Sequence, residues 1–256
     1  MKTGFPLKAD IESMQFIYDD TVFGPKTEKR KLDDIRSSLS NPEAEGPEYV
    51  YAVAMDVGKK KHREDLLKRN LLYGAMIFGA GTIGEEPVRS QGHIHAVSPS
   101  CNESTCEVYE IWKGTAYIYM QERAEDDPGR CYAVYAKEGQ VVIVPPGWVH
   151  CTINANPNQP MLFGAWCVRD YGFDYKKIRE HKGVAYFPKV QNGNIIFQPN
   201  SMYQPSKLEI VNARSYPEFH LKPDVPIYTQ YEERPEMFTF VTRPETASEI
   251  WENYKP

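Results

Sequence analysis

The spacing of proline and glycine constrains the fold of this chain more than any other sequence feature. The 256 residues include 20 prolines and 17 glycines, which recur every few positions with short β-branched and aromatic runs between them. Long helices do not fit between breaks this close together, whereas strands of about five or six residues do. The sequence therefore predicts an all-β fold, and the close spacing of the runs favours a sandwich or a barrel.

Seven runs carry the strongest strand signal. They are rich in Val, Ile, Tyr, Phe and Trp, and they cover residues 49–53, 71–78, 106–112, 115–120, 131–136, 141–144 and 161–168. Two glycines mark hairpins between predicted strands. Gly114 follows Lys113, and Gly193 follows Asn192 in an Asn-Gly pair, which readily forms a type I′ turn. Helical periodicity is confined to short pieces at 32–39 and 63–69.

The composition changes near residue 199, after which eight of the 20 prolines lie. A segment so rich in proline does not form central strands, and its many aromatic residues argue against disorder. We expect a barrel with its N-terminal strands over residues 1–198, and an extended arm over 199–256 that packs on the barrel or on a neighbouring subunit. Thr246 and Glu249 predict a capping box that opens a final short helix through Trp251.

Charge and hydropathy exclude several classes of function. The net charge is −5 and no basic run exceeds three lysines, so the sequence does not predict nucleic-acid binding. No apolar stretch approaches the roughly 20 residues that span a bilayer, and charged residues follow the first methionine too closely for a signal peptide. The five cysteines are odd in number and have no CxxC spacing, which favours free thiols. We therefore expect a cytoplasmic protein that acts on a small molecule.

Residues 79–84 match the GxGxxG pattern of dinucleotide-binding proteins. That pattern requires a helix directly afterwards, whose N-terminus receives the pyrophosphate. Glu85, Glu86 and Pro87 follow instead, and they do not favour a helix. We expect a loop between barrel strands here.

Three histidines and one glutamate carry the strongest chemical signal. His93 and His95 are two residues apart, so in a strand both imidazoles point to the same face. Glu107 begins the next predicted strand, and His150 follows a Pro-Gly turn. Such a set of ligands suits one divalent transition ion such as Fe(II), Mn(II), Ni(II), Co(II) or Zn(II).

The spacing around these residues resembles the two-part signature of the cupin barrel. Six residues separate Glu107 from Gly114, and the later part reads Gly139-x5-Pro145-x-Gly147-x2-His150-x3-Asn154. The resemblance implies a cupin fold, a double-stranded β-helix or jelly-roll barrel, with short helices and a Pro-rich C-terminal extension. Eleven residues separate His95 from Glu107, more than cupins usually have, so residues 97–103 predict a lengthened turn. Glu103 and Glu110 are alternatives to Glu107, although strand alternation places Glu110 on the opposite face.

Among cupins, the chain resembles the cupin-type, archaeal-type phosphoglucose isomerases, which interconvert glucose 6-phosphate and fructose 6-phosphate. The matching segments are residues 90–96, 107–109, 113–114, 142–154 and 172–175. The resemblance implies metal ligation by His93, His95, Glu107 and His150, with Fe(II) favoured. It also implies substrate binding by Ser90, Gly92, Tyr109, Tyr175 and, as a weaker match, Tyr51 or Tyr49.

Two departures from that family affect the pocket, because Cys167 stands where a tyrosine is usual and Phe173 where a histidine is usual. They leave open which group moves the proton of the sugar oxygen. Glu107 is the candidate catalytic base for a cis-enediol route, with a metal-driven hydride shift as the alternative. For the phosphate we expect the Ser90 hydroxyl, the amides near Gly92, and a cation, either Lys113 or Arg89.

Three other functions remain open from the sequence. The same ligands would serve an Fe(II) dioxygenase or decarboxylase, the two departures would suit a non-catalytic sugar-phosphate-binding cupin, and a mannose-6-phosphate isomerase is a near neighbour. Cupins commonly pair and the arm offers apolar surface, so a homodimer is favoured.

Overall fold

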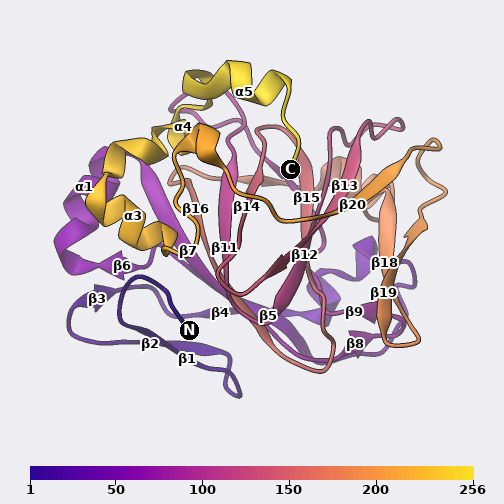
Figure 1. Cartoon of the computed structure of the whole chain (residues 1–256). Helices are drawn as coiled ribbons and strands as arrows, with labels where there is room; N and C mark the ends of the chain where they lie inside the picture. Colours follow the sequence, from indigo (N-terminus) through magenta and orange to yellow (C-terminus); the bar gives the residue numbers. More distant parts are fainter.

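Two sheets face each other in the computed structural model, which describes all residues from 1 to 256 (Figure 1). The first sheet has six strands in the order β14-β11-β16-β7-β5-β4 and the second has four in the order β15-β12-β13-β20. The strands of the six-stranded sheet are β4 (Glu28–Lys31), β5 (Tyr49–Met55), β7 (Leu71–Phe78), β11 (Glu107–Lys113), β14 (Val141–Val144) and β16 (Met161–Val168). Those of the four-stranded sheet are β12 (Thr115–Gln121), β13 (Cys131–Lys137), β15 (Val149–Asn154) and β20 (Leu208–Asn212). The predicted cupin barrel and all seven predicted strands are confirmed.

Strand β11 shows how alternation builds the barrel. Tyr109 and Ile111 lie in the core between the two sheets, whereas Val108 and Trp112 lie in a second core on the outer face of the six-stranded sheet. Since both faces are covered, the strand is buried along nearly its whole length. Glu107 shares the inward face with Tyr109, so the barrel interior receives its carboxylate.

The C-terminal segment covers the outer face of the six-stranded sheet. It contains helices α3 (Ile227–Glu233), α4 (Thr239–Thr242) and α5 (Ser248–Glu252). Helix α3 lies beside α1 (Arg63–Lys68), whereas α5 lies near the C-terminus and away from α1 (Figure 1). Tyr228, Tyr231 and Phe238 join Tyr73 and Trp166 in one aromatic cluster. This cluster packs the helical part of the segment on the sheet, while its first part adds β20 to the four-stranded sheet beside β13.

The expectation of an extended arm was wrong in part, because much of the segment is helical. Ile227, Tyr228 and Tyr231 are spaced so that one face of α3 buries all three, a pattern visible in the sequence. The final helix exists, but α5 begins at Ser248 without a side-chain cap. The hydroxyl of Thr246 instead donates to the carbonyl of Arg243 at 2.7 Å, so the predicted capping box is absent.

Glu110 joins this segment to the barrel. Its carboxylate is 2% exposed and accepts hydrogen bonds from Trp112 Nε1 at 2.9 Å and from the amide of Ile227, the first residue of α3, at 3.2 Å. Burial raises the pKa of Glu110 from 4.5 to about 7, and the two hydrogen bonds oppose that rise only in part. Between these two values the folded protein holds a proton here that the unfolded chain has released.

We therefore predict that this group makes the fold less stable as the pH rises from about 4.5 to 7. Glu110→Gln has no ionisable group at this position. The free energy of unfolding of the variant minus that of wild type should therefore increase by about 3 kcal/mol between pH 4.5 and 7. Urea unfolding of both proteins at pH 4.5, 6 and 8 measures the difference. A difference that does not change with pH would show that Glu110 ionises normally.

The remaining elements are short and surround the barrel. The paired ones are β1 (Leu7–Asp10) with β2 (Gln15–Tyr18), β3 (Val22–Phe23) with β6 (Gly58–Lys59), β8 (Thr82–Ile83) with β9 (Glu86–Pro87), β10 (Ile94–His95) with β17 (Phe173–Asp174), and β18 (Tyr186–Gln191) with β19 (Asn194–Pro199). Helix α2 (Lys176–Glu180) precedes β18, and residues 32–34 and 36–38 form 3-10 turns where a short helix was predicted. None of the helices has the length and apolar character that crossing a membrane requires.

Two predictions about glycine-containing turns are settled by these pairs. Asn192 and Gly193 have φ angles of 50° and 76°, as a type I′ turn requires, and they join β18 to β19. The GxGxxG segment contains β8 and the start of the turn to β9, and no helix follows it. It therefore lacks the geometry of a dinucleotide-binding turn.

Candidate metal centre

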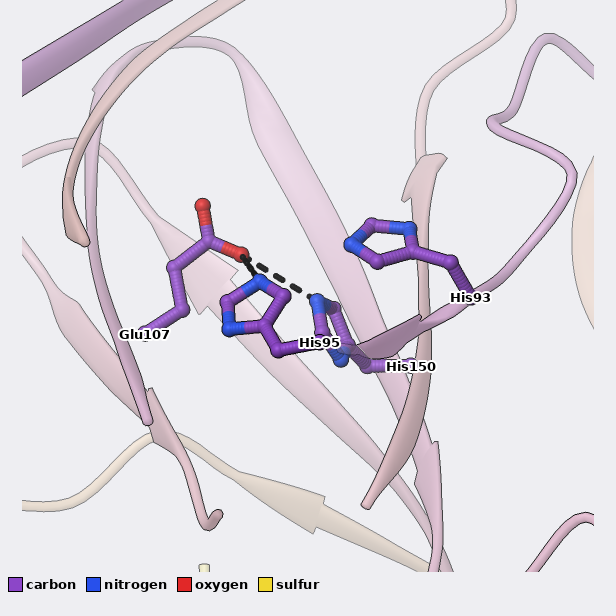
Figure 2. Close-up of side chains that lie close together, drawn as sticks. All are labelled: His93, His95, Glu107 and His150. Carbon is purple, nitrogen blue, oxygen red and sulfur yellow. Dashed lines mark hydrogen bonds and ion pairs between the residues drawn. The ribbon is translucent and has the colours of Figure 1, made fainter. Parts of the chain in front are cut away.

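Three segments far apart in the sequence bring the four candidate ligands together. His93 lies just before β10 and His95 lies on it, Glu107 begins β11, and His150 lies on β15. The backbone of His93 pairs with that of His150 through two hydrogen bonds of 3.0 and 2.9 Å, which fixes β10 beside β15. Each of the four side chains has a ligand atom within 4.8 Å of the other three (Figure 2).

Backbone carbonyls orient two of the imidazoles. His95 Nδ1 lies 2.9 Å from the carbonyl of Thr105, and His150 Nδ1 lies 3.2 Å from the carbonyl of Trp148. A carbonyl only accepts, so each Nδ1 must carry a hydrogen, and the neutral ring then has its lone pair on Nε2. This arrangement is usual for histidines that bind a metal.

Both Nε2 atoms face the same carboxylate oxygen. Glu107 Oε2 lies 3.3 Å from Nε2 of His95 and 3.1 Å from Nε2 of His150 (Figure 2). Lone pairs that face an anion at such distances repel unless positive charge stands among them. The contacts therefore fit a site for a cation.

The ionisation of these groups points the same way. Burial lowers the pKa of His93 and of His150 below the ordinary value, which favours neutral imidazoles. His93 Nε2 is buried and has no hydrogen-bond partner in the protein. Three imidazole nitrogens and one carboxylate suit a borderline divalent transition ion.

The segment between His95 and Glu107 forms the predicted lengthened turn, closed by a bridge between Ser98 and Glu103. The residue after this turn, Ser104, holds the backbone of His95, because its hydroxyl donates to the His95 carbonyl at 2.7 Å. Glu103 is exposed on this turn, and Glu110 points to the outer face of the sheet. Neither alternative carboxylate belongs to the cluster of candidate ligands.

A cavity of about 220 Å³ opens beside this cluster. Of the substrate residues that the sequence indicated, Ser90, Tyr51, Tyr109 and Tyr175 line it. Gly92 does not line it, although its backbone lies close by with a φ of +90°. A Cβ atom there would stand 2.8 Å from Val184 Cγ1, so this position requires glycine.

The two cations proposed for phosphate binding lie elsewhere. Lys113 is exposed at the end of β11, six residues and roughly 20 Å along the strand from Glu107, and does not line the cavity. Arg89 is fully buried, where it donates to Glu86, to the Ser90 carbonyl and to the Ser38 carbonyl. Neither side chain reaches a ligand in this cavity, which corrects the expectation.

Comparison with known proteins decides the family. The model of the family described as glucose-6-phosphate isomerase (GPI) matches residues 30–205, well over half of the chain. The chain belongs to the glucose-6-phosphate isomerase family. The match contains all four candidate ligands, and it ends before the helical C-terminal segment.

Several archaeal members of the GPI family are similar in sequence. The glucose-6-phosphate isomerase of Thermococcus litoralis is 27% identical over 79% of this chain and 98% of its own length. That of Thermococcus gammatolerans is 29% identical over 76% of this chain and 93% of its own length.

Among solved structures, an oxalate oxidase is similar at a TM-score of 0.32 and 15% identity, covering 41% of this chain and 45% of the other. The oxalate decarboxylase of Bacillus subtilis gives a TM-score of 0.35 and 14% identity, covering 62% of this chain and 30% of the other.

The two departures from the GPI pattern lie close to the candidate centre. Phe173 lies on β17, which pairs with β10, and its ring stands edge-on to that of His93 with centroids 4.5 Å apart. Cys167 is buried on β16 and shares its inward face with Phe163 and Ala165. Phe173 therefore presents an apolar edge to the site where the family pattern has a titratable ring.

Sequence reasoning missed other polar residues of the cavity wall, namely Lys26, Glu28, Arg30, Gln91, Thr152 and Tyr171. Gln91 could have been found from its place between Ser90 and Gly92. Lys26, Glu28 and Arg30 gave no signal, because their segment is almost entirely charged and does not read as a barrel strand.

Proposed function

We propose that this protein interconverts glucose 6-phosphate and fructose 6-phosphate, with one divalent transition ion held by His93, His95, Glu107 and His150. The observation that carries the proposal is the convergence of these side chains beside a cavity, in a member of the GPI family. Metal ions act in such reactions as Lewis acids that stabilise the negative charge developing on the sugar oxygens.

We assign two roles to Glu107, that of a metal ligand and that of the catalytic base. Its Oε2 meets both histidines and also accepts a hydrogen bond from the Tyr109 hydroxyl at 2.7 Å. The other carboxylate oxygen points away from the histidines (Figure 2). We assign to this second oxygen the transfer of a proton between C2 and C1 through a cis-enediol, which needs no detachment of Oε2.

The isotope content of the product distinguishes this route from a hydride shift. A proton that passes through a carboxylate exchanges with solvent, so isomerisation in D₂O should place deuterium on the carbon that receives it. Mass spectrometry of the fructose 6-phosphate and of recovered glucose 6-phosphate measures it. Product free of deuterium after many turnovers would favour the hydride shift.

The activity is tested on metal-stripped protein reconstituted separately with Fe(II), Mn(II), Ni(II), Co(II) and Zn(II). A coupled assay should detect fructose 6-phosphate with at least one of these ions and none with the stripped protein. Binding of glucose 6-phosphate without turnover under every ion would instead indicate a sugar-phosphate-binding cupin, the reading that Phe173 and Cys167 favour. Oxygen consumption would indicate dioxygenase chemistry. Faster turnover of mannose 6-phosphate than of glucose 6-phosphate would indicate that mannose 6-phosphate is the preferred substrate.

Three further parts of the proposal remain predictions. We expect Fe(II) as the native ion because the ligand set accepts it, a homodimer because such barrels commonly pair, and a cytoplasmic location. Metal analysis after anaerobic purification and light scattering test the first two.

A further inference from the structure

We infer that Lys26 and Arg30 form the phosphate-recognising end of the cavity, an inference that rests on the proposed sugar-phosphate substrate. They are the only lysine and arginine among its 19 lining residues. Lys26 precedes the segment that the family model matches, and Arg30 is the first residue within it. A dianionic substrate gains little from a chain of net charge −5 except where cations are concentrated locally.

Exposure places these cations at the outer end of the cavity. Glu107 is 7% exposed, whereas the Arg30 side chain is 40% exposed and Lys26 is exposed. The cavity therefore runs from a buried cluster of ligands to a cationic opening. A sugar phosphate matches this polarity when its C1–C2 end lies inside and its phosphate lies at the opening.

The surroundings of Arg30 add hydroxyl donors to the two charges. Arg30 lies on the edge strand β4 directly opposite Tyr51 of β5, in register. Tyr51 and Tyr175 line the same cavity as Arg30, so two phenol hydroxyls share its wall with the guanidinium. A guanidinium beside phenol groups can donate several hydrogen bonds to one phosphate.

Glu28 competes for the same guanidinium. Its carboxylate lies 3.2 Å from Arg30, and both side chains are well exposed, so the ion pair is weak and can be exchanged for a ligand. Phosphate binding would replace this contact. Removing the Glu28 charge should therefore strengthen the binding of phosphate esters, the opposite of removing Arg30.

The test uses sorbitol 6-phosphate, which has no carbonyl group and cannot isomerise, with sorbitol as the unphosphorylated probe. Calorimetric titrations of metal-loaded wild type, Arg30→Met, Lys26→Met and Glu28→Gln compare affinities. Lys29→Met is the matched control, because Lys29 carries the same charge on the same strand and does not line the cavity. Metal content measured on every variant checks that the inner site is intact.

We expect sorbitol 6-phosphate to bind Arg30→Met roughly 10- to 100-fold more weakly than wild type, as the loss of a charged hydrogen bond implies. Lys26→Met should also weaken it, Glu28→Gln should tighten it, and Lys29→Met should leave it unchanged. Sorbitol should bind all five proteins alike.

Equal affinity of wild type, Arg30→Met and Lys26→Met would overturn the inference, as would a wild type that does not bind the phosphate ester. Wild type that binds it through these residues but never forms fructose 6-phosphate would keep this inference and refute the isomerase proposal.

Discussion

Replacing Glu107 by glutamine is expected to lower isomerase turnover by about 10² to 10⁴-fold while part of the metal is retained. The amide keeps the size of the side chain and an oxygen that can ligate, but it cannot accept and return a proton. The Tyr109 hydroxyl and both histidines would still meet the side chain, so the fold of the site should persist. Turnover and metal content measured on the same preparations give both results.

Glu103→Gln is the matched control for this variant. Glu103 lies on the lengthened turn that precedes Glu107, was an alternative ligand from the sequence, and is exposed. Its replacement should change neither metal content nor turnover. Full activity in Glu107→Gln would show that the carboxylate is a bystander, and loss of activity in Glu103→Gln would point to the turn itself.

Replacing His150 by alanine is expected to abolish activity through loss of the ion. The variant removes one of the three proposed nitrogen ligands and also the nearer imidazole contact of Glu107. Because even partners outside the first shell of a metal site change affinity by about 10- to 100-fold, loss of a ligand should exceed that range. Equilibrium dialysis against buffered metal, followed by elemental analysis, measures the loss.

His181→Ala serves as the control for a histidine outside the cluster. His181 contacts Asp126 and the Lys177 carbonyl, and it is not one of the four proposed ligands. Its replacement should leave metal affinity unchanged. If His150→Ala bound metal as tightly as wild type, the proposed ligand set would be incorrect.

The parts of the site that could be predicted are those fixed by local geometry. His93 and His95 share a face because strand residues two apart always do, and Glu110 is excluded from the site by the same alternation. The spacing of the cupin motif adds the pairing of β10 with β15, which brings His150 within reach. Sequence reasoning was reliable here because few alternative geometries satisfy the pattern.

The parts that could not be predicted depend on tertiary placement. Lys113 is next to a motif glycine in the sequence, yet the length of β11 carries it far from Glu107. Arg30 enters the cavity from a charged edge strand, whose pairing with β5 no periodicity announces. Similarly, proline spacing suggested an extended arm, whereas helices α3 to α5 form because their aromatic residues have an apolar sheet to cover.

Anomalous X-ray diffraction from crystals of the metal-loaded protein tests the central claim most directly. We predict one strong peak per chain among the Nε2 atoms of the three histidines and a carboxylate oxygen of Glu107, each about 2.0 to 2.2 Å from the ion. A peak held by other residues, or no peak in protein that carries one equivalent of metal in solution, would contradict the account.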